Sequence, residues 1–568
     1  MILTLRDAFL ISILFVSTIS AQTDKTGVIT GRVVTEDGTA MANVTVTLSQ
    51  AGVANNSSNT GSSTLTDDDG KFRFENLPPR LYTINVAQAK EYVMIPVSSN
   101  ENGRPRYYRI GDNPVITMIK GGVITGKVTG TKMEPIIGIR VTPVKVKDSD
   151  GRSVFTVISG RAKITDDRGI YRLYGLGPGT YIVYANRSSS VARSPYSLPP
   201  TFHPSSSRDT ASRIEVTAAG EVANIDIEFG QIRTGSTVAG TVISDNKLSS
   251  VMKDGHISLY DAATGDFVTS TNFNPTDFGH NFTFSDIHNG EYWLTALIAN
   301  RSNTNDGTAA ISEQRRIAVR GSNVTGIELK LTPTASIAGR VILDTTSQTC
   351  DQKKISSIQE ILISAQRSNM EASMPISVGS TGAVNEKGEF LLRNLGSGRY
   401  RINPLIVDEN RYVKTIMASG KTSSAIYDAS QGELLVKPGD AITGLTVTIS
   451  DGASSLLGKV VSKKEGDSLS SRLRVYLVPR ISGPTDNHLL YAETLTSKDG
   501  AFIFKNRAPG RYWILVQSMP GAEIPDNSLM PTSFDINYRA KLRKEAEANK
   551  VEVELKPCQR LTDQMVMY

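Results

Sequence analysis

Cysteine is scarce in this chain of 568 residues, which contains only Cys350 and Cys558. Two cysteines exclude a disulfide-rich framework, in which several bridges compensate for a small hydrophobic core. A single bridge would require the two Cα atoms to lie within about 7 Å of each other. The sequence does not give that distance, so it leaves open whether the two cysteines pair.

Histidine is also scarce, and the five histidines form no HxxE or HExxH pattern: His203, His256, His280, His288 and His488. A zinc peptidase would need such spaced ligands together with a general base. No GxSxG elbow, phosphate-binding loop or dinucleotide motif is visible either. We therefore expect a protein that is not an enzyme, with no catalytic residues, no metal site and no cofactor. An unrecognised hydrolase is kept as the weakest alternative.

Long hydrophobic runs are missing after residue 21. Residues 1–21 look like a secretory signal peptide, with Arg6, an apolar run over 8–16 and small residues at Ser20 and Ala21. No later stretch approaches the about 20 apolar residues of a membrane-spanning helix. The net charge of +6 is small for this length and the basic residues are scattered, which disfavours nucleic acid as a partner. We expect a secreted, periplasmic or cell-surface protein without a transmembrane span in the mature chain. The sequence does not determine its oligomeric state.

What the sequence does contain is a strand motif that occurs five times. Each copy centres on a glycine with apolar residues two positions before and two after it, a period of two that is typical of a strand. The opening glycines are Gly31, Gly126, Gly240, Gly339 and Gly458. A glycine inside a strand indicates that another strand or an aromatic ring approaches closely there.

Each copy also carries a hairpin in which a turn glycine precedes a tyrosine by 12 or 13 residues. The turn glycines are Gly70, Gly169, Gly279, Gly388 and Gly500, and the tyrosines are Tyr82, Tyr181, Tyr292, Tyr400 and Tyr512. Aspartate and glycine favour tight turns, because glycine accepts positive φ and aspartate bonds nearby backbone. The tyrosines stand at a fixed place after the turn. This place predicts that their rings are buried and their hydroxyls bonded, as in a tyrosine corner, and that the rings do not stack on sugars.

The repeat divides the mature chain into five units. After the signal peptide at 1–21, we expect unit 1 at 22–118, unit 2 at 119–234, unit 3 at 235–333, unit 4 at 334–452 and unit 5 at 453–568. Roughly seven short strands per unit predict an all-β fold, a tandem array of about five antiparallel Greek-key β-sandwich domains. Because no Gly/Ser linker separates the units, they should form a semi-rigid rod. In unit 5, we expect a short helix at 537–549 near the C-terminus and the strand VEVEL, which begins at Val551, as the closing strand.

These motifs resemble the carboxypeptidase regulatory-like family, a transthyretin-like or prealbumin-like sandwich that is also grouped with carbohydrate-binding-like folds. The matching segments are Gly31 with TDDDGKF and LPPRLY, Gly126 with TDDRGIY and LGPGTY, EKGEF with LGSGRY in unit 4, and Gly458 with SKDGAF and APGRY. Unit 3 departs from the pattern, since Phe278 replaces the turn aspartate and HNGEY replaces the proline closure. The resemblance implies five tandem copies of an accessory domain in a bacterial protein.

Four aromatic residues outside the repeat are candidates for ligand contact. Tyr107 and Tyr108 lie in RPRYYRIG, and Tyr196 and Phe202 lie in PYSLPPTFHP, both of which look like loops. Packing against a neighbouring unit is the alternative for these rings. The acidic turns at 67–69 and 166–167 lack the ligand spacing of an EF-hand, and whether they bind calcium stays open.

The hypothesis that follows is a secreted, non-catalytic binding protein with several domains, whose partner is a glycan or a cell-surface protein. A structural spacer or accessory array without a small ligand is the alternative.

Overall fold

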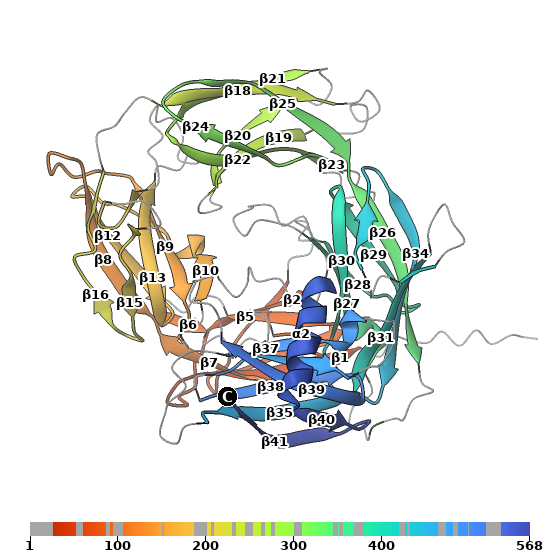
Figure 1. The fold of residues 1–568 in the computed structure, drawn as a ribbon. Helices are drawn as coiled ribbons and strands as arrows, with labels where there is room; N and C mark the ends of the chain where they lie inside the picture. The colour runs from red at the N-terminus through yellow and green to blue at the C-terminus, as the bar shows by residue number, and fades with distance from the viewer. Residues whose placement is uncertain are drawn as a thin grey trace, which may run out of the picture.

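The computed structural model describes residues 26–52, 61–86, 91–94, 106–149, 151, 153–186, 201–205, 210–229, 235–244, 254–262, 267–273, 279–299, 309–344, 350, 356–368, 380–419, 426–428, 432–463, 473–480, 487–497, 499–518 and 536–568. The expected signal peptide and Tyr196 lie outside these ranges. The all-β class and the tandem β-sandwich architecture are confirmed, and the sandwiches follow one another around an arc (Figure 1). No helix in the described part of the chain has the length and apolar character needed to cross a membrane.

The first sandwich has two sheets, with strand orders β4-β1-β7-β6 and β3-β2-β5. Its strands are β1 (Gly27–Thr35), β2 (Thr45–Gln50), β3 (Ser62–Leu65), β4 (Lys71–Leu77), β5 (Tyr82–Val86), β6 (Tyr92–Met94) and β7 (Val115–Lys120). The boundary expected after residue 118 falls inside β7, so unit 1 extends two residues further than the sequence suggested.

The second sandwich pairs a sheet around β8 with a sheet around β9 and β13. Its elements are β8 (Gly122–Thr129), β9 (Arg140–Lys147), β10 (Ser153–Val157), the 3₁₀ turn η1 (Ser159–Arg161), β11 (Lys163–Ile164), β12 (Ile170–Leu176), β13 (Gly179–Asn186), β14 (Thr201–Phe202), β15 (Ile214–Val216), β16 (Glu221–Val222) and β17 (Ile227–Glu228).

The third sandwich is continuous through β23, so its two layers form one sheet of order β20-β19-β22-β23-β25-β18-β21, with β24 on β22. Its strands are β18 (Ser236–Ile243), β19 (Asp254–Asp261), β20 (Phe267–Phe273), β21 (His280–Ile287), β22 (Gly290–Ala299), β23 (Ala309–Ser312), β24 (Arg315–Val319) and β25 (Val324–Pro333).

The fourth sandwich has the orders β29-β26-β34-β31-β32 and β28-β27-β30-β33. Its elements are β26 (Ala335–Asp344), η3 (Ile358–Glu360), β27 (Ile361–Arg367), β28 (Ser380–Ala383), β29 (Glu389–Leu395), β30 (Gly398–Ile406), β31 (Arg411–Ser419), β32 (Ile426–Asp428), β33 (Leu434–Val436) and β34 (Ala441–Asp451).

The fifth sandwich has the orders β38-β35-β41 and β37-β36-β39-β40, with a helix on the outer face of the second sheet. Its elements are β35 (Ser454–Val461), β36 (Leu473–Pro479), η4 (His488–Leu490), β37 (Ala492–Leu495), β38 (Ala501–Arg507), β39 (Gly510–Ser518), α2 (Ile536–Asn549), β40 (Glu552–Leu555) and β41 (Arg560–Met567). Leu542 and Ala546 of α2 pack against Trp513 and Leu515 of β39.

One pairing scheme recurs in all five sandwiches. The opening strand pairs antiparallel with the hairpin strand and parallel with the closing strand; these sets are β1 with β4 and β7, β8 with β12 and β17, β18 with β21 and β25, β26 with β29 and β34, and β35 with β38 and β41. The sheets are therefore mainly antiparallel, and the opening strand brings a parallel pairing into each unit.

The closing strand of unit 5 differs from the one expected. VEVEL was expected to close the unit, but β40 (Glu552–Leu555) pairs antiparallel with β39, and β41 pairs with β35. The pattern of β41 is a weak signal because Val566 is its only fully buried apolar residue, and the polar Gln564 stands opposite Gly458.

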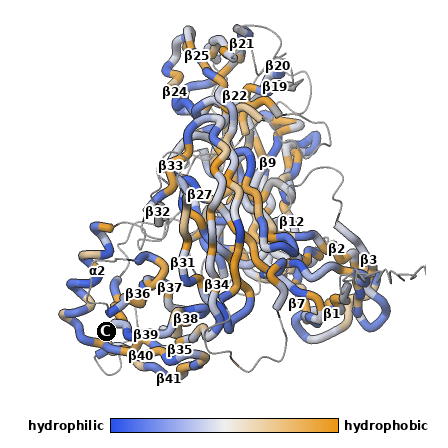
Figure 2. The backbone as a smooth tube through the Cα atoms, turned by 90° about the vertical axis from the view of Figure 1, so that its right-hand side faces the viewer, coloured by the Kyte–Doolittle hydropathy of each residue, from blue (hydrophilic) through white to orange (hydrophobic). Residues whose placement is uncertain are grey.

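Five large hydrophobic clusters, one in each sandwich, account for most of the buried apolar residues in the described ranges. Hydrophobic and hydrophilic residues alternate along many of the strands, as Figure 2 shows, because successive side chains point to opposite faces of a sheet. The inward pair of each hairpin strand lies in these cores: Phe72 and Phe74, Tyr171 and Leu173, Phe282 and Phe284, Phe390 and Leu392, and Phe502 and Phe504.

The opening glycines lie where the closing strand approaches most closely. A Cβ atom on Gly126 would collide with the Ile225 carbonyl and the Tyr171 hydroxyl, and one on Gly458 would collide with the Phe502 ring and the Gln564 carbonyl. Glycine is therefore needed for lack of space, and not for an unusual φ.

The hairpin tyrosines share one geometry. In every unit the ring is buried, and the hydroxyl donates to the carbonyl oxygen four residues earlier, from Tyr82 to Pro78 (2.8 Å), Tyr181 to Gly177 (2.6 Å), Tyr292 to His288 (2.9 Å), Tyr400 to Gly396 (2.9 Å) and Tyr512 to Ala508 (2.7 Å). Burial raises the pKa of the Tyr82, Tyr400 and Tyr512 hydroxyls to about 12. These rings therefore fill the cores of the sandwiches, and their hydroxyls are bonded within the hairpin.

Candidate functional site

The units do not form a rod, because unit 1 packs against unit 4. Ala51 and Leu81 of unit 1 form a buried cluster with Leu362 of β27, and Tyr107 packs against the same cluster. A Cβ atom on Gly52 would collide with Leu362, so the two backbones approach closely. The rod was expected from linker composition alone, which carries no information about contacts between units distant in sequence.

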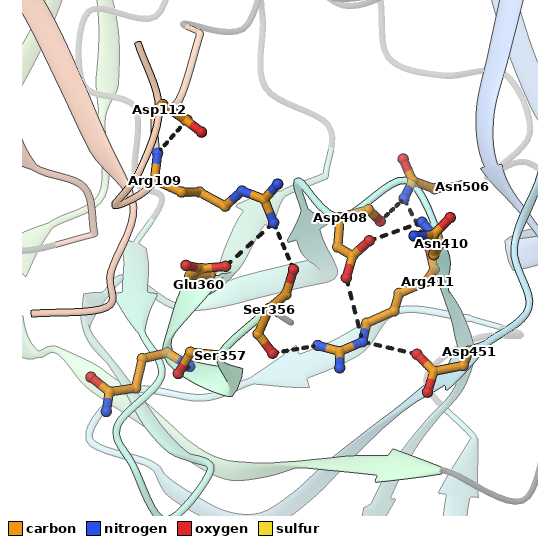
Figure 3. Close-up of polar contacts among 11 residues, drawn as sticks. Arg109, Asp112, Ser356, Ser357, Glu360, Asp408, Asn410, Arg411, Asp451 and Asn506 are labelled. Carbon is orange, nitrogen blue, oxygen red and sulfur yellow. Dashed lines mark hydrogen bonds and ion pairs between the residues drawn. The ribbon is translucent and has the colours of Figure 1, made fainter. Parts of the chain in front are cut away.

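A largely buried polar network continues from this contact into units 4 and 5, and Figure 3 shows its members apart from the exposed ion pair of Glu409 and Lys505. We call this region the junction; its polar residues are Arg109, Ser356, Glu360, Asp408, Glu409, Arg411, Asp451, Lys505 and Asn506.

Arg109 connects unit 1 to unit 4. Its Nη1 donates to the Ser356 hydroxyl at 2.6 Å and lies 3.5 Å from Oε2 of Glu360. The backbone amide of Arg109 donates to Asp112 at 2.7 Å, which holds the loop that carries the guanidinium. Glu360 is only 4% exposed, and a buried carboxylate needs such a partner.

Arg411 lies at the centre of the unit 4 part of the network. Its Nε donates to Asp451 at 3.0 Å and lies 3.7 Å from Asp408, and its Nη1 donates to the Ser356 carbonyl at 3.2 Å. Ser356 therefore accepts from Arg109 through its hydroxyl and from Arg411 through its carbonyl. All three charged groups of this part are at least nine-tenths buried.

Unit 5 is attached to unit 4 by polar contacts and by a disulfide. Asn506 Nδ2 donates to the carbonyl oxygens of Asp408 at 2.6 Å and Arg411 at 2.8 Å. Lys505 Nζ forms an ion pair with Glu409 at 2.8 Å. Cys350 and Cys558 are bonded, with a Cα–Cα distance of 5.4 Å. The pairing that the sequence left open is thus present, and it joins two units.

A groove of about 420 Å³ lies where units 1 and 4 meet. Gly27, Val28, Pro79, Ile110 and Gly111 line it from unit 1, and Ser357 and Glu360 line it from unit 4. Its wall is mainly apolar, and the one charged residue in it, Glu360, is already paired with Arg109.

The predicted binding aromatics take different places. Tyr108 is buried in the core of unit 1, and Phe202 is buried against Tyr184 in unit 2 with ring centroids 5.1 Å apart. Tyr107 is partly buried at the contact with unit 4, and Tyr196 lies outside the described residues. Packing accounts for the three rings that are described, and the structure does not bring them together.

The acidic turns use their oxygens on the backbone. Asp67 Oδ1 accepts from the amides of Asp69 (3.0 Å) and Lys71 (2.7 Å), and Asp166 Oδ1 accepts from those of Arg168 (3.0 Å) and Ile170 (2.8 Å). No group of three or more histidine, cysteine or acidic residues in the described ranges could hold a metal ion.

The junction residues were not found from the sequence. The segment RPRYYRIG suggests a contact through its aromatic residues, but the residue in it that reaches unit 4 with its charge is Arg109. Arg109 and Ser356 are 247 residues apart in the chain. A contact over such a separation produces no periodic pattern in the sequence.

Contact between units 1 and 4 should depend on Leu362, which lies on the outer face of unit 4 and outside its core. Leu362→Asp would place a charge in the buried cluster and is expected to separate unit 1 from unit 4 while unit 4 stays folded. Small-angle scattering should then show a larger radius of gyration. Leu391→Asp is the matched control, since Leu391 is 38% exposed in the same unit. An unchanged radius for Leu362→Asp would mean that the cluster does not hold the units together.

Comparisons with known proteins agree with a sandwich of this kind in unit 1. Residues 28–98 match the family model of the carboxypeptidase regulatory-like domain. No curated protein matches the chain.

Among solved structures, the chain is similar to the minor pilin GBS52 of Streptococcus agalactiae, with 14% identity, a TM-score of 0.21 and coverage of 37% of this chain and 98% of the pilin. It is also similar to two B repeat units of the collagen-binding protein of Staphylococcus aureus, with 13% identity, a TM-score of 0.13 and coverage of 75% and 100%. A putative polysaccharide-binding protein of Bacteroides thetaiotaomicron has 10% identity, a TM-score of 0.16 and coverage of 30% and 76%.

Proposed function

We propose that this protein is a secreted, non-catalytic binding scaffold, in which the junction holds the sandwiches in a fixed arrangement while they contact a glycan or a cell-surface protein. The observation that carries the proposal is the junction itself. An apolar cluster, a buried ionic network and a disulfide all act between units, whereas a flexible array would need none of them.

The disulfide between Cys350 and Cys558 supports export, because such bonds persist in oxidising compartments outside the cytoplasm. This agrees with the signal peptide expected at 1–21. The simple spacer is less well supported, because a spacer gains length from end-to-end units, and here unit 1 folds back onto unit 4.

Binding can be tested directly with the mature full-length protein. A glycan array and a pull-down from cell surfaces should each be run on the wild type and on Leu362→Asp. A partner that binds the wild type more tightly than the variant would support a scaffold whose arrangement matters. Absence of any partner, or turnover of peptide or glycoside substrates in a broad panel, would contradict the proposal.

Loss of the disulfide should destabilise the attachment of unit 5. In the double variant Cys350→Ser and Cys558→Ser, we expect a loss of about 2–5 kcal/mol, as for other native disulfides. Hydrogen exchange of β35 and β41 would measure it, with reduced wild type as an independent route to the same state. Equal protection with and without the bond would show that the polar contacts of Asn506 and Glu409 suffice.

A further inference from the structure

Unit 2 carries a glycine at a position of the hairpin strand where units 1, 4 and 5 carry an asparagine. The residue before the last one of this strand has a positive φ in four units, and it is Asn76, Gly175, Asn394 and Asn506 in units 1, 2, 4 and 5. Asparagine tolerates this conformation, so glycine is not required for the backbone. Something else must occupy the space that a side chain would fill in unit 2.

The guanidinium of Arg161 occupies that space. A Cβ atom on Gly175 would collide with Nη1 and Cζ of Arg161 and come within 3.0 Å of its Nη2. Arg161 ends η1 and is 8% exposed, and its Nη1 is buried with no hydrogen-bond partner in the described part of the protein. Burial lowers the pKa of this guanidinium, and the groups that oppose the shift are the phenols of Tyr174 and Tyr181, not carboxylates.

Two lysines flank the same turn. Lys145 Nζ lies 5.6 Å from the centroid of the Tyr181 ring and 3.4 Å from the position that a Cβ atom on Gly177 would take. Lys163 Nζ lies 4.2 Å from the centroid of the Tyr174 ring and donates to its hydroxyl at 3.0 Å. We call Lys145, Arg161 and Lys163 the basic cluster.

The positive charge of the basic cluster is poorly compensated. Burial lowers the pKa of Lys145, and the charge of Asp148 opposes this shift only in part. The Lys163 ammonium lowers the pKa of the Tyr174 phenol, to which it is hydrogen-bonded. No ion pair between a member of the cluster and a carboxylate is present in the described residues. Burying a cation without a counter-ion is destabilising, because its lost hydration is not replaced, and an incoming anion would offset this cost.

We propose that the basic cluster of unit 2 binds an oxyanion, a carboxylate, sulfate or phosphate group, beside the turn formed by residues 175–179. The partly exposed Lys145 and Lys163 form the rim that such a group reaches first, and its charge neutralises that of Arg161. Tyr174, which is 37% exposed, stands beside Lys163 as a ring that the rest of the ligand can contact. The site shares no residue with the junction. A test of anion binding is therefore independent of a test of the scaffold role.

The test is calorimetric titration of the mature protein with acetate, sulfate and phosphate, at an ionic strength held constant with chloride because screening alone changes charged surfaces. We expect saturable binding to the wild type. Arg161→Gln removes the buried charge and should weaken binding at least tenfold. Arg168→Gln is the matched control, since Arg168 is in the same unit but is 73% exposed and pairs with Asp166; it should bind like the wild type.

Gly175→Asn provides a second variant that preserves the fold, because it introduces the residue that units 1, 4 and 5 carry at this position. It should displace the guanidinium and also weaken binding at least tenfold. Binding of acetate alone would indicate a carboxylate ligand, and binding of sulfate or phosphate would indicate a sulfated or phosphorylated one.

Three results would overturn the proposal. These are no saturable binding of any of the three anions, equal affinity in Arg161→Gln and the wild type, or, where Arg161→Gln does not fold, unchanged affinity in both Gly175→Asn and Lys163→Gln.

Discussion

Arg411→Ala is expected to destabilise unit 4 at the junction by about 3–5 kcal/mol, the range for removing one partner of a buried ionic network. The variant would leave the carboxylates of Asp408 and Asp451 buried without their cation, and the Ser356 carbonyl would lose its donor. The cost arises mainly from these uncompensated charges rather than from the lost attraction.

Hydrogen exchange of β31 and β34 is the suitable measurement, because a chain of several domains does not unfold in one transition. Lys414→Ala is the matched control on the same strand. Lys414 pairs with Asp344 at 2.6 Å but is 47% exposed, so its loss should cost at most about 1 kcal/mol. If both variants exchange alike, the network around Arg411 contributes no more than a surface ion pair.

Gly126→Ala is expected to destabilise unit 2 by about 1–3 kcal/mol, which is typical of inserting a methyl group into a packed core. The new Cβ atom would collide with the Ile225 carbonyl, which belongs to rigid backbone and already accepts a hydrogen bond from the Tyr171 hydroxyl. Strand β8 cannot move away from this carbonyl without losing its pairing with β12 or with the closing segment.

Gly160→Ala is the control for this variant. Gly160 is in the same unit, has no atom within 4 Å of the Cβ position and has no positive φ, so alanine should be neutral or stabilise by up to about 1 kcal/mol. Hydrogen exchange of β8 measures both. Equal protection in the two variants would show that the closing segment adjusts to the added methyl group.

The sequence predicted the interior of each sandwich better than the relations between sandwiches. Alternation around Gly126 and the turn at Gly169 express local rules of strand and turn formation, and the same rules act in each unit. The helix expected at 537–549 is observed at Ile536–Asn549, because its narrow apolar stripe needs only one nearby sheet to pack against.

Contacts between units follow other rules. Arg109 and Ser356 meet because two surfaces fit, and neither residue type nor spacing shows that fit in advance. In RPRYYRIG the aromatic residues are the conspicuous feature of the sequence, but Tyr108 fills a core and Arg109 makes the charged contact. Gly175 stands where units 1, 4 and 5 carry Asn76, Asn394 and Asn506, and the sequence does not explain the difference, because the space is filled by Arg161, which is 14 residues away in the chain.

The parallel pairing of opening and closing strands also bears on how the protein is synthesised. Each sandwich places its first strand between a hairpin strand and the last strand of the unit, so the sheet lacks one central pairing until the whole unit has left the ribosome. In unit 1, residues 32–35 cannot form their parallel pairing until residues 115–118 have been synthesised. Contacts this distant in sequence also form slowly. Units should thus mature one at a time along the nascent chain. Unit 1, whose partner surface on unit 4 is made more than 200 residues later, completes its contacts only after that surface has been synthesised.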